Sequence, residues 1–250
     1  GEKDLASSGL PQGRELAFLE EVRKDLPPEV FTQPYKIPLN TSPQDVRANM
    51  REATRLLGEA GYTPKNGVLT NTKTGQSLSA EFLLYNPTFE RIVQPYVGVL
   101  KLLGVQASLR TIDVAQYQRR IDDFDFDVVI GSFPQSASPG NEQRDFFGSA
   151  AAGIQGSRNI IGLKSPAIDT LIDRIIFAKD RDDLAAATRA LDRVLLWGHN
   201  VVPQWYSGKD RIAYWTRYMR PSKLPSRATS FLQVWCWDAA GAAKLQAARK

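Results

Sequence analysis

The stretch SAEFLLYNPTFERIVQPYVGVLKLLGVQASLRTIDVAQYQRRIDDFDFDVVIG, residues 79–131, decides the fold. Its short apolar runs have the length of buried strands, and they lie at 79–85, 105–112 and 126–130. The segments between them, 88–103 and the one that begins after Asp113, show the apolar spacing of helices. Strand–helix–strand–helix–strand is the order of an α/β domain in which helices pack on a sheet.

A loop follows the third of these strands, between Gly131 and the charged run 142–145. It holds Pro134, Pro139 and Gly140 among small and amide side chains. A rigid strand that delivers such a loop is a common way to line a binding cleft, because the scaffold fixes the loop and the loop carries the recognition. The alternative interpretation is an ordinary surface loop.

Side chains in and near this loop are predicted to contact a ligand. Phe133 and Trp205 are candidates for the walls of a mostly apolar pocket, although most aromatic residues of this half of the chain are expected in the core. The polar candidates are Ser132, Gln135, Ser136, Ser138, Asn141 and Arg144. For Arg144, a surface ion pair with Glu142 or Asp145 is the alternative, and such pairs contribute little stability.

Upstream of this region, the apolar spacing of 43–60 predicts a helix with Ser42 as its N-cap. A hairpin with a polar turn is expected at 67–75. Residues 1–44 are rich in proline and show only one short possible helix, at 14–23. This segment is therefore expected to cross a surface or join domains, and not to contribute to a core.

Downstream, two helices are predicted, one from Ser165 or Pro166 and one from about Asp182. The further predicted elements are strands at 201–207 and 212–215 around a turn at 208–210, a terminal strand at 231–237 and a helix at 239–248. The domain prediction is a Pro-rich lead-in at 1–41, an α/β ligand-binding lobe at 42–217, and a linker with a return segment at 218–250.

Composition excludes several kinds of site. The single cysteine, Cys236, excludes an internal disulfide and a cysteine-based zinc site, and the single histidine, His199, excludes a histidine-rich metal site. The net charge is +5 with a pI near 9.3, but the basic residues are dispersed, so nucleic-acid binding is not expected. The sequence shows no run of membrane-spanning length, no signal peptide and no phosphate-binding glycine motif.

The case for catalysis is weak in the sequence. The sequence contains no GxSxG motif that would supply a serine nucleophile for His199, so this residue is interpreted as a capping or core residue. Cys236 lies between two tryptophans and is interpreted as a packed thiol. The carboxylates of 122–127 leave one alternative open, a hydrolase that uses them as an acid–base pair, although neighbouring side chains point different ways.

Four stretches carry a resemblance to a known family. They are LLGEAGY (56–62), EFLLYNPTFERIVQPYVGVLKLLGV (81–105), SLRTIDVAQYQRRIDDFDFDVVIG (108–131) and SPAIDTLIDRIIFAKDRDDLAAATRALDRVLLWGHNVVPQWY (165–206). Their order and spacing resemble the C-terminal lobe of the oligopeptide/dipeptide/nickel class of solute-binding proteins of ABC importers. SPGNEQRDFFGSAAA (138–152) and the closing VVPQWY resemble the branch that includes microcin C and peptide-type importers.

The resemblance implies a periplasmic-binding-protein-like type II lobe, a mixed sheet flanked by helices, in a two-lobed protein that closes on its ligand by a hinge. It implies capture of a peptide or peptide-like solute in the periplasm and delivery to permease and ATPase subunits, by a monomer with no cofactor and no chemistry. The first lobe and the signal peptide are expected to lie outside this sequence, with 1–41 derived from the hinge and 218–250 returning to the missing lobe.

One departure from the family pattern concerns the ligand. Peptide binders of this class place an aspartate in the loop after the third strand, to pair with the peptide α-ammonium. The corresponding position here is about Gln135, and no acidic residue lies between Gly131 and Asn141. An amide can hydrogen-bond an ammonium but provides no charge pairing, so a simple α-ammonium anchor at Gln135 is not expected.

A third functional hypothesis is a structural or protein-interaction domain. Trp235 and Trp237 would then form an exposed apolar patch near the end of the chain. This hypothesis predicts association through the last twenty or so residues.

Overall fold

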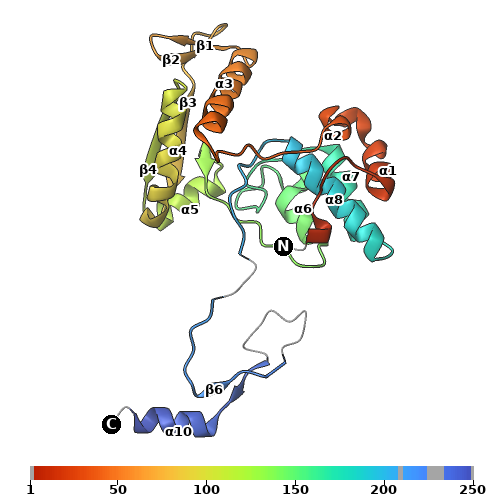
Figure 1. Cartoon of the computed structure of the whole chain (residues 1–250), viewed down its shortest axis with the longest axis vertical. Helices are drawn as coiled ribbons and strands as arrows, with labels where there is room; N and C mark the ends of the chain where they lie inside the picture. Colours follow the sequence, from red (N-terminus) through yellow and green to blue (C-terminus); the bar gives the residue numbers. More distant parts are fainter. Residues whose placement is uncertain (1–2, 208–210, 224–233, 249–250) are drawn as a thin grey trace. The chain divides into compact units, whose positions relative to one another are not determined.

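The computed structural model describes residues 3–207, 211–223 and 234–248 (Figure 1). The chain divides into two compact units, Gly1–Gln204 and Trp205–Lys250. Within the first unit, two separate clusters of buried residues form, one in an α/β layer and one among helices.

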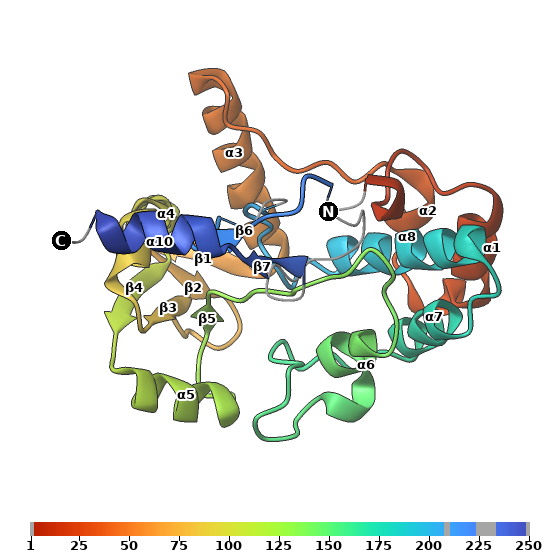
Figure 2. The same ribbon diagram turned by 90° about the horizontal axis from the view of Figure 1, so that it is seen from below.

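The α/β layer is built on a parallel three-stranded sheet of order β4-β3-β5 (Figure 2). The strands are β3 (Ser79–Leu84), β4 (Gln106–Thr111) and β5 (Val128–Val129). Their connections are the helices α4 (Glu90–Leu102) and α5 (Val114–Asp122). The predicted strand–helix–strand–helix–strand order is confirmed, although β5 is shorter than the predicted strand at 126–130.

The central strand β3 is covered on both faces. Phe82 and Leu84 belong to a cluster with Val93 and Val97 of α4, while Leu83 is fully buried. Because successive side chains of a strand alternate between faces, Leu83 points to the face opposite the other two. Burial of both faces is typical of parallel sheets and accounts for the unbroken apolar run in the sequence.

A helix and a hairpin precede this sheet. The helix α3 (Pro43–Glu59) begins with a capping box in which Ser42 accepts from the Asp45 amide and the Asp45 carboxylate accepts from the Ser42 amide, so the predicted helix and its cap are confirmed. Strands β1 (Tyr62–Lys65) and β2 (Val68–Asn71) form an antiparallel hairpin. Gly104, at φ +91°, follows α4, and a Cβ there would lie 3.1 Å from the Leu69 amide nitrogen.

The second cluster of buried residues joins helices from both ends of the first unit. These helices are α1 (Gly13–Glu21), α2 (Glu29–Thr32), α6 (Glu142–Phe147), α7 (Pro166–Ile176) and α8 (Arg181–Trp197). Short 3₁₀ turns accompany them and the sheet at Lys3–Leu5, Arg23–Asp25, Pro87–Phe89 and Ser149–Ala151. The predicted helices at 14–23, from 165 or 166 and from about 182 are confirmed.

The expectation that residues 1–44 contribute to no core is wrong. Leu19 and Val30, on α1 and α2, are completely buried against α7 and α8. Prolines in this segment stand between the helices, and they divide the apolar pattern into pieces too short to show a clear period. The assignment of 1–41, 42–217 and 218–250 as hinge, lobe and return segments stays a prediction.

In the second unit, the strands β6 (Tyr218–Met219) and β7 (Cys236–Trp237) pair antiparallel, and α10 (Ala239–Ala247) confirms the predicted last helix. The predicted strands at 201–207 and 212–215 are wrong for the described residues, which belong to no strand there. The predicted turn at 208–210 and residues 231–233 of the predicted terminal strand lie outside the described residues. Cys236 is exposed, so its interpretation as a packed thiol is wrong, because the side chains of this short ladder are open to solvent.

Among the helices that the structure describes, none combines the length and the apolar character needed to cross a membrane.

Candidate functional site

The candidate loop connects the sheet to the helical core. It leaves β5, whose residue Val128 pairs with Phe82 of β3, and it ends at α6. Just before β5, the Asp127 carboxylate accepts a hydrogen bond of 2.9 Å from the Glu81 amide of β3. Strand pairing and this side-chain contact therefore fix the point at which the loop begins.

Phe133 anchors the loop in the helical core. Its ring lies 5.7 Å from that of Phe146 and 5.3 Å from that of Phe147, centroid to centroid. Both partners are buried residues of α6. Edge-on and tilted ring contacts of this kind are favourable aromatic geometries, so the observed role of Phe133 is packing.

Gln135 lies against a buried amide. The Gln143 amide nitrogen donates to Gln135 Oε1 at 2.7 Å, and the Gln135 amide nitrogen donates back to Gln143 Oε1 at 3.4 Å. Gln143 is 3% exposed and also donates to Glu142. The sequence interpretation missed Gln143 because it lies in the charged run 142–145, and the signal available was an uncharged amide between Glu142 and Arg144.

The remaining loop candidates are exposed. The Ser136 hydroxyl accepts from the Ser138 amide at 3.1 Å, and Asn141 precedes α6 without capping it through its side chain. Arg144 pairs with Asp173 of α7 at 2.8 Å. The predicted surface ion pair at Arg144 is thus present, but with a partner on another helix.

Within the first unit, the loop candidates lie in different surroundings: Gln135 and Phe133 each contact α6, while Ser132 is exposed. Trp205 belongs to the second unit. A cavity of about 360 Å³ lies elsewhere, lined by α1, α7 and the start of α8, and Phe18 and Phe177 are among its walls. None of the candidates lines it, so their role in ligand contact stays a proposal.

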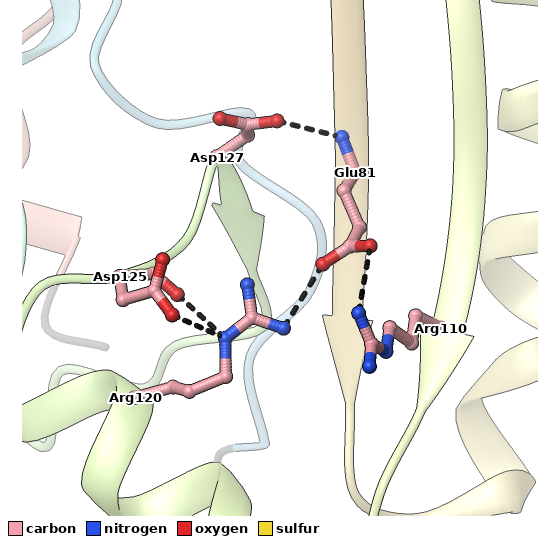
Figure 3. A network of polar contacts seen from close by, with 5 residues as sticks. All are labelled: Glu81, Arg110, Arg120, Asp125 and Asp127. Carbon is pink, nitrogen blue, oxygen red and sulfur yellow. Dashed lines mark hydrogen bonds and ion pairs between the residues drawn. The ribbon is translucent and has the colours of Figure 1, made fainter.

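All four carboxylates of 122–127 accept hydrogen bonds within the protein, and Figure 3 shows the contacts of Asp125 and Asp127 with Arg120 and with Glu81 of β3. The Arg120 guanidinium donates to Asp125 at 2.9 Å and to Glu81 at 3.0 Å, while Arg110 lies 3.8 Å from Glu81. Desolvation lowers the pKa of Arg120, but its contacts with Glu81 and Asp125 outweigh this effect and raise the pKa above the ordinary value. Asp122 and Asp123 accept from Gln118 and Gln155 respectively.

These contacts do not favour the hydrolase alternative, which stays a prediction. A general acid and base must face a substrate, and each of these carboxylates already accepts a hydrogen bond from a donor of the protein itself. Within the described residues, no group of three or more histidine, cysteine, aspartate or glutamate side chains is placed to hold a metal ion. His199 lies at the end of α8 with its ring 6.0 Å from Tyr35 and 5.9 Å from Trp197, which is a packing arrangement.

Replacing Gln143 tests how the loop is held. We expect Gln143→Leu to lower the free energy of unfolding by about 0.5–1.5 kcal/mol, since the hydrogen bonds of Gln143 are lost while the exposed Gln135 and half-buried Glu142 oxygens remain open to water. Amide exchange across 131–141 should become faster, as measured by hydrogen–deuterium exchange and mass spectrometry. Gln118→Leu, on the exposed side of α5, is the control and should leave the loop unchanged. Wild-type exchange in the loop of Gln143→Leu would show that the amide pair does not order it.

Comparison with known proteins identifies the family of this chain. The family model of the bacterial extracellular solute-binding proteins, family 5 middle region, matches residues 20–154. The chain belongs to this family of solute-binding proteins, which confirms the resemblance carried by the four sequence stretches.

Two relatives come from Agrobacterium fabrum. The probable peptide-binding protein YejA is 49% identical over 95% of this chain, and the peptidoglycan-binding protein YepA is 38% identical over 90% of it. The chain spans 39% and 36% of the lengths of these two relatives. Both relatives are named as binding proteins and not as enzymes.

Solved structures confirm the fold as a type II periplasmic-binding-protein lobe. The mannohexaose-bound oligopeptide-binding protein of Thermotoga maritima aligns with a TM-score of 0.57 at 19% identity, over 69% of this chain and 35% of its own. The oligopeptide-binding protein AppA of Bacillus subtilis, in complex with a nonapeptide, aligns with a TM-score of 0.53 at 21% identity, over 60% of this chain and 30% of its own.

Proposed function

We propose that this chain is part of the substrate-binding component of an ABC importer that captures a peptide or peptide-like solute in the periplasm. The bound solute passes to the permease and ATPase subunits without chemical change, and the component acts as a monomer. The observation that carries this proposal is the 49% identity to a probable peptide-binding protein over 95% of the chain.

The site geometry supports binding without chemistry. The loop at 131–141 follows a strand of a parallel sheet, and it is held at both ends by packing and hydrogen bonds. The carboxylates of 122–127 accept hydrogen bonds from Arg120, from side-chain amides and from the Glu81 backbone amide. Closure of a second lobe over this surface would then supply the rest of the binding energy, as in hinge-bending proteins.

Calorimetric titration of the full-length protein with a pool of short peptides tests the proposal. We expect heat of binding that follows lobe closure, and no release of altered peptide over time. Absence of heat with every peptide in the pool would reject peptide capture.

A matched pair of peptides, one with a free N-terminus and one N-acetylated, tests whether the protein pairs a charge with the peptide α-ammonium. Since Gln135 provides no charge, we expect similar affinities for the two, whereas loss of a charge-assisted contact would lower affinity by about tenfold or more.

A further inference from the structure

The carboxyl edge of the parallel sheet carries apolar side chains that are open to solvent. Tyr85 follows β3, Val114 follows β4 and Ile130 follows β5, and they are 46%, 63% and 38% exposed. Because the three strands run parallel, these positions meet at one edge of the sheet. This edge, defined here as Tyr85, Val114, Ile130 and the neighbouring Tyr117, forms an apolar surface at the start of the candidate loop.

The strand order singles out one point on this edge. From the central strand β3 the chain passes through α4 to β4, which pairs with one edge of β3. It then passes through α5 to β5, which pairs with the opposite edge of β3. In open α/β sheets, ligands bind outside the carboxyl ends of the strands where the connections diverge in this way. Tyr85, the residue after β3, lies at that point.

Tyr85 is paired with a second tyrosine. Its ring centroid lies 4.8 Å from that of Tyr117, on the first turns of α5, with the ring planes at 53°. Two adjacent rings present a broad apolar surface with polar tips. Burial, with a smaller contribution from Tyr85, raises the pKa of Tyr117. A tyrosine hydroxyl is protonated at neutral pH even at its ordinary pKa, so both hydroxyls can donate a hydrogen bond.

Three other polar side chains near this edge already have hydrogen-bond partners. Asn86 accepts from the Thr88 amide, Asp113 caps α5 through the Ala115 and Gln116 amides, and Glu90 accepts from the Thr111 hydroxyl at 2.6 Å. In the described part of the chain, neither the Tyr85 nor the Tyr117 hydroxyl has a hydrogen-bond partner. The edge therefore offers the two rings and their phenol hydroxyls to a ligand, while the Asp113 and Glu90 carboxylates are already engaged by neutral donors of the protein.

We propose that the Tyr85–Tyr117 pair is a ligand-contact site that takes an uncharged apolar or aromatic side chain of the captured peptide. The rings and the flanking Val114 and Ile130 contact the side chain, and the hydroxyls hydrogen-bond to the peptide backbone. This inference rests on the proposed capture of a peptide and specifies which peptides are preferred. A charged side chain would lose hydration against the two rings, whereas an apolar side chain would not.

The test uses the full-length protein and three tetrapeptides: tetra-alanine, and tetra-alanine with one phenylalanine or one lysine at an internal position. Calorimetry should show tightest binding of the phenylalanine peptide. Tyr85→Ala and Tyr117→Ala should weaken it by about tenfold and change tetra-alanine binding much less. Tyr85→Phe keeps the ring and should retain most of the phenylalanine preference.

The matched control is Tyr96→Ala. Tyr96 is 43% exposed and makes an edge-on ring contact with Phe82, as an exposed tyrosine of α4 away from the strand ends. We expect its replacement to leave the relative affinities for the three peptides unchanged. Circular dichroism on every variant separates loss of binding from loss of fold.

Nitration with tetranitromethane followed by mass spectrometry gives a second readout. Tyr85 should be nitrated in the free protein and protected by the phenylalanine peptide, while Tyr96 should react equally in both. Wild-type affinities in Tyr85→Ala and Tyr117→Ala, or unprotected Tyr85, would overturn this inference and leave peptide capture intact. Failure of the wild-type protein to bind any of the three tetrapeptides would also overturn this inference, whereas peptide capture is rejected only if no peptide of the pool binds.

Discussion

Replacing Glu15 by alanine is expected to lower the free energy of unfolding by about 3–5 kcal/mol, which is the range for breaking a buried ion pair. Arg193 of α8 is 1% exposed, and its Nε donates to Glu15 Oε1 at 2.8 Å. Its other nitrogens donate to the backbone oxygens of Gly9 and Ser8. The substitution removes the carboxylate and leaves a buried guanidinium charge without a counter-charge.

Chemical denaturation of the two variants Glu15→Ala and Glu21→Ala checks this expectation. Glu21 pairs with Arg174 at 2.7 Å in an exposed position, so its replacement should cost no more than about 1 kcal/mol. The double variant Glu15→Leu/Arg193→Met should lose less free energy of unfolding than Glu15→Leu or Arg193→Met alone, because no buried charge remains in it. Equal effects of Glu15→Ala and Glu21→Ala would contradict a buried pair that fastens the N-terminal segment to α8.

The attachment of the N-terminal segment to α8 was not predicted from the sequence. The contacts of Arg193 and of Asp192, which accepts from Ser7, join positions about 180 residues apart along the chain. Local periodicity carries no information on such pairs, since each partner looks like an ordinary charged or polar surface residue. The proline-rich composition of residues 1–44 favoured the wrong interpretation for the same reason: its short helices are stabilised by distant partners and not by a local pattern.

The α/β layer, in contrast, could be predicted in detail. Apolar runs at 79–85 and 105–112 and the helical spacing between them are local signals, and Ser42 and Asp113 are caps with a physical mechanism. The strands predicted at 201–207 and 212–215 rested on the same kind of apolar run. A run of this type becomes a strand only where a neighbouring strand pairs with it, and the sequence alone does not supply that neighbour.

The candidate site was predictable in its position and less so in its residues. The loop after β5 was predicted from the change of composition at Gly131, but the packing of Phe133 and the Gln135–Gln143 pair depend on where α6 lies. Tyr85 and Tyr117 were interpreted only as members of a strand and a helix. Their pairing at one edge follows from the strand order β4-β3-β5, which periodicity does not determine.

Replacing Leu83 by alanine should separate the stability of this sheet from its contact with a ligand. Leu83 is fully buried in the middle strand, so Leu83→Ala is expected to cost about 2–5 kcal/mol through lost burial and the cavity that remains. Leu102→Ala is the control, since Leu102 of α4 is 79% exposed and its replacement should change stability by no more than about 0.5 kcal/mol. Denaturant unfolding of the full-length protein measures both.

The same variant discriminates between two roles for the edge of the sheet. If Tyr85 acts through its own contact with the ligand, Leu83→Ala should bind the phenylalanine peptide almost normally at temperatures where it is fully folded, while Tyr85→Ala binds weakly despite a smaller loss of stability. If instead Leu83→Ala binds the phenylalanine peptide more weakly than Tyr85→Ala, so that affinity falls with stability, Tyr85 only supports the sheet. Leu83 lies in β3, and Tyr85 directly follows that strand. The two substitutions therefore probe the same end of the sheet, one at a buried side chain and the other at an exposed one.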